Sequence, residues 1–416
     1  MTSRAMTAGV GVAFVAASIV SPLVLKTTPS DLDLYFWPSA ETVVNGHPLL
    51  IYAAHVHDVY PNANGPLGLV PLIPVVALAD ALGWASSLAG RASMAGAVVS
   101  LAVLLLAYQV VGFAASARGG VRHPLGIAST VLLAPALWIA VLDYGHVEQP
   151  IELCLVLFAL SSLLSDRNVS SGIALGAAVL TRTIAGFCLI PLIFAALATR
   201  RIRPAATIVL AAAATIGAGI LPFFLADANA VTHALITYRG SLPIGGGSFL
   251  VVAREAAWAG LVKGGDAYLA VAVAIALTGL TLLRKPALAT THAGLAGLVT
   301  VASCCFPLFA KTVFPYYLLE PYVFATLWWL ARPGSARTWR AVVPGLLTID
   351  VFIVKAASIS PFSAWGIVAG ITSSATVAIA VALVTFDLLR SPEHAVDHVV
   401  QRVHSPQTRP AAQEAR

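Results

Sequence analysis

The chain alternates between long apolar runs and short polar turns. Its first apolar run, Ala5 to Leu25, follows Arg4, and no small-x-small cleavage motif precedes Lys26. This run is longer than the core of a cleaved signal peptide, which has about 7 to 15 residues, so we predict a retained signal anchor. Further apolar runs cover residues 67–83, 95–115, 124–142, 150–165, 170–199, 205–225, 267–283, 293–310, 316–331, 341–357 and 364–388.

These runs predict the fold class. A helix that crosses a membrane needs about 20 mostly apolar residues, and most of the runs approach that length. The run 170–199 is long enough for two short helices with a break near Thr181-Arg182-Thr183. We predict an all-α, polytopic integral membrane helical bundle with about 10 to 12 transmembrane helices. Juxtamembrane or re-entrant helices are expected on its external side.

Composition narrows the class of protein. Of the 416 residues, 59% are hydrophobic and only 10% are charged, and the mean hydropathy is +0.88. Soluble domains carry roughly 25% charged residues, which excludes a cytosolic enzyme. The net charge of +6 does not indicate nucleic acid as a partner, because basic residues of membrane proteins gather in cytoplasmic loops. The four cysteines lie in apolar runs without CxxC spacing, so neither a zinc site nor a disulfide framework is indicated.

The basic residues also predict the orientation in the membrane. If segment 67–83 dips into the outer leaflet and returns, 16 of the 24 basic residues fall on the side that holds Arg4, and 8 fall outside. If that segment crosses fully, the two numbers are exchanged. The positive-inside rule therefore favours a re-entrant or juxtamembrane segment, in a cell-membrane protein with both termini cytoplasmic.

This orientation divides the chain into regions. Residues 1–390 are predicted to form one transmembrane domain with two external loops, 26–65 and 226–266. The tail 391–416 is polar and contains two prolines, so we expect it to be cytoplasmic and disordered.

Polar side chains gather at one face of the predicted bundle. Charged groups at membrane depth are costly, and they are functional candidates by default. A one-sided group favours an active site that opens outward, because a transporter places its key polar groups near the midplane, in paired broken helices. At or near the external face we expect Asp31, Asp33, Asp58, Asp143, His146, Glu148, Arg182, Arg239, Lys311 and Glu320.

The first external loop predicts a helix on the membrane surface. Leu34, Trp37 and Ala40, followed by two valines, recur at helical spacing. Such a helix places Asp31 near the membrane boundary. On periodicity alone, the favoured interpretation is that Asp31 or Asp33 caps this helix, since aspartate is common at helix starts.

Several short motifs resemble a known family. The run Asp31-Leu-Asp-Leu-Tyr35, then Gly46-His-Pro48 and Gly65-Pro66-Leu67, is similar to the first external loop of polyprenol-phosphate-sugar-dependent glycosyltransferases of the GT-C fold. The pattern resembles glycosyltransferase family 87, which includes mycobacterial mannosyltransferases. Here the family's Tyr-Pro-Pro element is stretched into residues 60–66.

Three later segments extend the resemblance. Residues 144–149, Tyr-Gly-His-Val-Glu-Gln, resemble the family's Gly-Gln-Val-Asn/Asp element, with His146 in place of glutamine. Leu180-Thr181-Arg182 is similar to Leu-Thr-Lys-Pro, and Tyr316-Tyr317-Leu-Leu to Gln-Tyr-Leu-Leu. The match covers the first 200 residues by motif and the rest mainly by architecture.

The resemblance implies an activity and a set of residues. It implies that a sugar is transferred with inversion from a polyprenyl-phosphate donor to a glycolipid or cell-envelope glycan. Mannose is the first candidate for this sugar, and a pentose is the second. It assigns the general base to Asp31, with Asp33 and Asp58 as alternatives on the same loop. The substrate-binding candidates are Tyr35, His57, His146, Glu148, Tyr316, Tyr317 and Glu320.

The leaving lipid phosphate needs a fixed cation. The planar arginine fork suits phosphate oxygens. Arg182 is the first candidate, followed by Arg239 and Lys311. The alternative is that any of these cations pairs with an acidic neighbour such as Asp143, Glu148 or Glu320.

Two further alternatives concern metals and function. The run His55-Val-His57-Asp58 suggests a metal, but substrate contact or loop packing is favoured, and no cofactor is predicted. A multi-pass transporter or lipid flippase is the alternative function. A non-catalytic envelope-assembly protein is a third.

Overall fold

The computed structural model describes residues 3–25, 29–53, 61–119, 124–199, 202–238, 242–253, 259–331, 337–359 and 363–390. Within these residues almost the whole chain is helical, because nearly every apolar run satisfies its backbone hydrogen bonds internally, as a bilayer requires. The long helices are α1 (Ser3–Leu25), α4 (Leu88–Arg118), α7 (Glu148–Leu164), α8 (Asn168–Thr181), α9 (Gly186–Ala198), α10 (Ile202–Ala226), α13 (Ala259–Arg284), α14 (His292–Phe309), α15 (Leu319–Ala331), α17 (Val342–Ile359) and α18 (Ala364–Arg390).

Shorter elements connect the long helices. The short α-helices are α2 (Trp37–Val44), α3 (Ile73–Ala81), α5 (Pro124–Leu132), α6 (Pro135–Ile139), α11 (Ala228–Thr232) and α16 (Arg337–Arg340). The π-helical turns are η1 (Leu32–Phe36), η4 (Ala140–Tyr144) and η6 (His233–Thr237). The 3-10 turns are η2 (Pro48–Leu50), η3 (Pro66–Gly68), η5 (Thr183–Ala185), η7 (Phe249–Ala253), η8 (Pro286–Thr290) and η9 (Pro315–Leu318). Two residues of β1 (Gly245–Gly246) pair in parallel with β2 (Thr312–Val313).

The structure confirms the predicted all-α, polytopic membrane architecture. Six of the described helices are long and apolar enough to cross a membrane, or up to seven if the pair 124–132 and 135–144, bent by 48°, forms one span. Shorter apolar helices cover residues 8–24, 168–181 and 183–198. The predicted number of 10 to 12 spans therefore stays a prediction.

The bundle is organised around α14. This helix packs against α9, α13, α15 and α18, and 78% of its most apolar 18-residue window is buried. The corresponding fraction for α10 is 11%, which places α10 at the periphery. Close packing of α10 on α8 depends on Gly172 and Gly176, where a Cβ atom would lie 2.5 Å from the carbonyl oxygen of Ile208 and 2.7 Å from that of Ala212.

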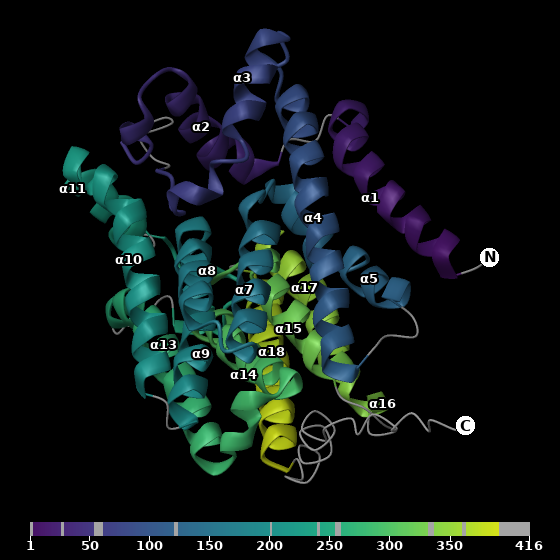
Figure 1. Ribbon diagram of the computed structural model, residues 1–416. Coiled ribbons are helices and arrows are strands. Elements are labelled where there is room, and N and C mark those ends of the chain that lie inside the picture. The colour runs from purple at the N-terminus through teal and green to yellow at the C-terminus, as the bar shows by residue number, and fades with distance from the viewer. Residues whose placement is uncertain are drawn as a thin grey trace, which may run out of the picture.

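The short helices α2, α3 and α11 lie toward one end of the bundle (Figure 1). Figure 1 shows α2, α3 and α11 together at the top, and α16 and the last turn of α18 at the bottom. Helix α3, within the segment 67–83, is about 14 Å long, less than the ~30 Å of a bilayer core. This length agrees with a segment that does not cross. In α2, Trp37 and Ala40 are fully buried and the helix packs against α3, so a helix forms in the segment where periodicity predicted one, while its position on the membrane surface stays a prediction.

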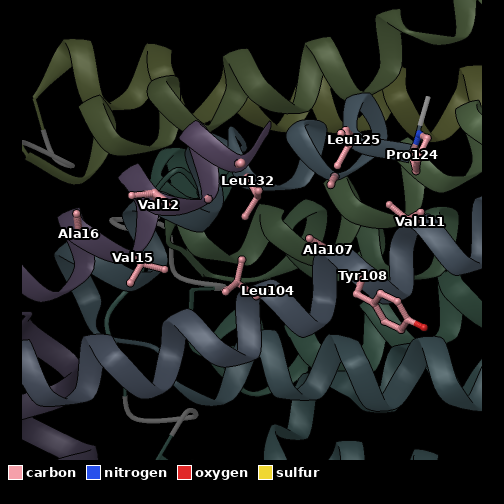
Figure 2. A pocket seen from close by; sticks show the side chains of 13 residues that line it. Val12, Val15, Ala16, Leu104, Ala107, Tyr108, Val111, Pro124, Leu125 and Leu132 are labelled. Carbon is pink, nitrogen blue, oxygen red and sulfur yellow. The ribbon is translucent and has the colours of Figure 1, made fainter. Parts of the chain in front are cut away.

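An apolar cavity of about 1010 Å³ lies between α1, α4 and α5. Figure 2 shows side chains of Val12 and Val15 from α1 and of Leu104 from α4 around this space. Tyr108 is the residue with a polar side-chain atom among those that line it. The cavity shares no lining residue with the polar cavity described next.

Candidate functional site

Asp31 stands at the start of η1 and projects into the site. Its side chain accepts no hydrogen bond from a helix N–H, so it does not cap the helix as periodicity favoured. Instead, Oδ2 lies 3.1 Å from His146 Nε2 and accepts a hydrogen bond of 3.4 Å from the Tyr316 hydroxyl. Ser30 Oγ donates to Oδ1 at 2.9 Å. Three groups therefore fix the orientation of this carboxylate.

His146 lies in the loop between η4 and α7. Its Nδ1 bonds to Oε1 of the fully buried Glu148, and its Nε2 faces Asp31. Burial alone would lower the pKa of His146. The negative charges of Glu148 and Asp31, together with the hydrogen bonds that the ring forms with both, outweigh burial and raise the pKa of His146 to about 9. The ring therefore carries a positive charge at neutral pH.

Arg182 occupies the break between α8 and η5. Its backbone is extended there, with φ −151°, and its side chain is 1% exposed. Nη1 donates to Glu320 Oε1, while Glu148 and Glu152 carboxylate oxygens each lie 3.9 Å from the guanidinium. The guanidinium also lies 5.6 Å from the ring centroid of Tyr316. The alternative that Arg182 pairs with acidic neighbours is thus confirmed.

One nitrogen of this guanidinium remains available. Nη2 of Arg182 is buried and has no hydrogen-bond partner among the described residues. Glu320 is held on its other oxygen by Gln149 Nε2 at 3.0 Å, and the same amide nitrogen donates to the backbone oxygen of Tyr316 at 2.7 Å. The carboxylates therefore fix the position of Arg182 and leave it one donor group for a ligand.

A cavity of about 100 Å³ brings these groups together. It is lined by Asp31, Tyr35, Phe36, Ala63, Asn64, His146, Arg182, Tyr238, Leu242, Phe314, Tyr316 and Tyr317. Six of these were candidates from sequence: Asp31, Tyr35, His146, Arg182, Tyr316 and Tyr317. The hydroxyls of Tyr35 and Tyr238 lie 2.8 Å apart, joining the first external segment to the second. A carboxylate, an arginine and several aromatic rings thus surround one space.

Other predicted residues lie outside this lining. Glu148 and Glu320 form ion pairs with Arg182. Asp33 forms an ion pair of 3.0 Å with Arg91. Lys311 is buried beside β2, where its backbone N–H donates to Asp266 at 2.9 Å. His57, Asp58 and Arg239 lie outside the described residues.

Sequence reasoning missed three contributors. Glu152 lies one helical turn after Glu148 in α7. This i,i+4 spacing places both carboxylates on one face of the helix, and it was the signal that could have identified Glu152. Gln149 directly follows Glu148 in the same first turn. Tyr238 gave no local signal, because only the tertiary fold brings it to Tyr35.

No three described His, Cys, Asp or Glu side chains are arranged as a group of metal ligands. The run His55-Val-His57-Asp58 that suggested a metal lies in the part of the chain that the structure does not describe.

Gly145 sets the turn that presents His146. Its φ is +73°, and a Cβ atom there would lie 2.5 Å from Leu32 Cβ. We expect Gly145→Ala to lower the free energy of unfolding by at least about 2 kcal/mol, because the left-handed conformation alone costs roughly 1–2 kcal/mol. Detergent-titrated unfolding measures this change. Gly112→Ala in α4, where an added Cβ atom would have nothing within 4 Å, is the control. Equal stability of the two variants would contradict the role of this turn.

Comparisons with known proteins define the fold. No family model matches the sequence, and no curated protein matches it. The crystal structure of ArnT from Cupriavidus metallidurans bound to undecaprenyl phosphate is similar, with a TM-score of 0.51 over 97% of this chain and 80% of that chain. The sequence identity is 16%. The chain therefore has the GT-C fold of a multi-pass membrane protein, which confirms the fold that the motifs implied.

Proposed function

We propose that this protein is an inverting glycosyltransferase that moves a sugar from a polyprenyl-phosphate donor to a glycolipid or cell-envelope glycan. The observation that carries the proposal is that Asp31 and Arg182 line one cavity. Mannose is the proposed sugar, as in glycosyltransferase family 87. The fold neighbour, ArnT, was crystallised with undecaprenyl phosphate, which supports a lipid-phosphate donor.

The chemistry assigns a role to each side of the cavity. An acceptor hydroxyl attacks the anomeric carbon and forms the new glycosidic bond. The bond between that carbon and the phosphate oxygen breaks, and the electron pair leaves with the polyprenyl phosphate. Asp31 takes the hydroxyl proton, a contribution of about 10²- to 10⁴-fold. Asp33 and Asp58 remain the alternative bases.

Arg182 is the proposed partner of the leaving phosphate. Its unpartnered Nη2 supplies a charge-assisted donor, and the three carboxylates around it keep the fork fixed as negative charge develops. Arg239 and Lys311 remain alternatives. Tyr35, Tyr316 and Tyr317 offer ring faces and hydroxyls for the sugar. The proposed reaction uses no cofactor.

The setting of the reaction is also a proposal. We place the site on the outer face of the cell membrane, with both termini cytoplasmic. This orientation rests on the 16 basic residues that it keeps inside.

Transfer of labelled sugar tests the proposed function. Membranes of a strain that lacks the gene are supplied with the wild-type protein and with radiolabelled polyprenyl-phosphate mannose or pentose. We expect a labelled glycolipid or glycan from the mannose donor, and the same species missing from the lipid profile of the deletion strain. Movement of a solute or of the donor lipid across the membrane, without transfer, would instead support a transporter or flippase.

A further inference from the structure

We infer that His146 is the positioning residue of the site and that Glu148 holds its ring so that Nε2 fixes the Asp31 carboxylate toward the acceptor hydroxyl. This inference rests on the proposed function and deepens it. The residues form a chain of contacts, Asp31, then His146, then Glu148, then Arg182, in which Glu148 is the member that does not line the cavity.

The two nitrogens of His146 have different surroundings. Nδ1 bonds to Glu148, whose side chain is 0% exposed, while Nε2 lies 3.1 Å from Asp31, whose side chain is 18% exposed. Glu148 Oε1 also lies 3.9 Å from Arg182 Nε. Glu148 therefore holds the ring from a fully buried position, and Asp31 is the carboxylate that meets substrate.

Packing leaves the imidazole little freedom. The Tyr316 ring centroid lies 4.0 Å from that of His146, and Phe36 lies edge-on at 5.4 Å. The titratable and charged groups that face the ring are Asp31 before η1, Tyr144 of η4, Glu148 of α7 and Tyr316 of η9, with Arg182 reached through Glu148. Because aromatic rings and two carboxylates enclose the ring, its rotation about χ2 would break both contacts.

The charged ring donates to both carboxylates at once. When the ring loses a proton, a single N–H remains, and the fully buried Glu148 retains it because an unpaired buried carboxylate is the costlier loss. Nε2 then presents a lone pair to Asp31 and repels it. Proton loss therefore releases the carboxylate from its orientation. We expect transfer to be maintained below pH 9 and to fall as pH rises through about 9.

Two substitutions distinguish the roles of Nδ1 and Nε2 of His146. The amide nitrogen of glutamine reaches the position of Nε2, and that of asparagine reaches the position of Nδ1. We expect His146→Gln to keep kcat within about tenfold of wild type, and His146→Asn to lower kcat by about 100-fold with little change in KM, since misplacement by about 1 Å costs about that factor. His47→Asn, an exposed histidine of the same external segment, is the control.

The pH profile gives a second readout. Neither amide titrates, so both His146 variants are expected to lack the alkaline fall. Glu148→Gln removes the charge that raises the His146 pKa, so its alkaline fall is expected to move toward neutral pH. A His146→Asn enzyme with wild-type kcat, or with the alkaline fall retained, would overturn the inference.

A measurement without donor keeps the inference separate from the proposed function. In protein with ¹⁵N-labelled histidine, the signal that His146→Asn removes is expected to titrate near pH 9 and to move in Asp31→Asn. If this signal titrates near the ordinary value of about 6.5 in both proteins, the inference fails whatever the enzyme transfers. If the signal behaves as expected but no donor is consumed, the proposed function fails instead.

Discussion

Arg182→Met is expected to lower the free energy of unfolding by about 3–5 kcal/mol, because it leaves buried carboxylates without their cation. Glu320, Glu148 and Glu152 all lie within 4 Å of this guanidinium and are at most 2% exposed. The change is measured by titrating the protein in mild-detergent micelles with a denaturing detergent. The same substitution is expected to abolish sugar transfer, because Arg182 is the proposed phosphate partner.

Two further variants serve as comparisons for Arg182→Met. Arg91→Met removes the partly exposed ion pair with Asp33 and the contacts of Arg91 with Ala85 and Trp37, but it leaves no fully buried carboxylate unpaired, so a smaller loss of stability than in Arg182→Met is expected. Adding Glu320→Gln to Arg182→Met removes one of the uncompensated charges and is expected to recover part of the lost stability. Loss of no more than about 1 kcal/mol in Arg182→Met would contradict the ion network.

Asp31→Asn is expected to lower kcat for transfer by about 10²- to 10⁴-fold, because asparagine cannot take the proton of the acceptor hydroxyl. The amide is nearly isosteric and still accepts a hydrogen bond from His146. We therefore expect the thermal unfolding midpoint to stay close to wild type. Single-turnover transfer at saturating donor measures the effect on the chemical step.

Asp33→Asn and Asp58→Asn test the alternative bases. Asp33 forms a partly exposed ion pair with Arg91 and does not line the cavity, so its replacement is expected to lower transfer by less than about fivefold, the equivalent of about 1 kcal/mol. If Asp33→Asn or Asp58→Asn abolishes transfer while Asp31→Asn retains it, the base has been assigned to the wrong residue.

The sequence predicted the helical architecture because membrane helices are defined by local composition. The break near Thr181-Arg182-Thr183 was also local, and it appears in the structure as the end of α8 and the start of η5. The GT-C fold followed from short motifs in the first half of the chain and from the bilayer requirement for helices in the second.

The geometry of the site depended on contacts that no local pattern contains. Arg182 pairs with Glu320 across 138 residues, and Asp31 meets Tyr316 across 285 residues. Helical periodicity predicted a helix in the first external loop but not which aspartate faces inward. Residues two apart along a helix point to different sides, and here Asp31 faces His146 while Asp33 faces Arg91.

Sugar transfer from a polyprenyl phosphate, at one site formed by Asp31 and Arg182, can be tested directly with the purified protein in liposomes. Radiolabelled polyprenyl-phosphate mannose is the donor, and a lipid extract of the deletion strain supplies the acceptor. We expect a labelled glycolipid whose anomeric configuration is inverted relative to the donor, formed by wild type and not by Asp31→Asn. Unconsumed donor, with a solute or lipid moved across the bilayer equally well by both proteins, would contradict the proposed function.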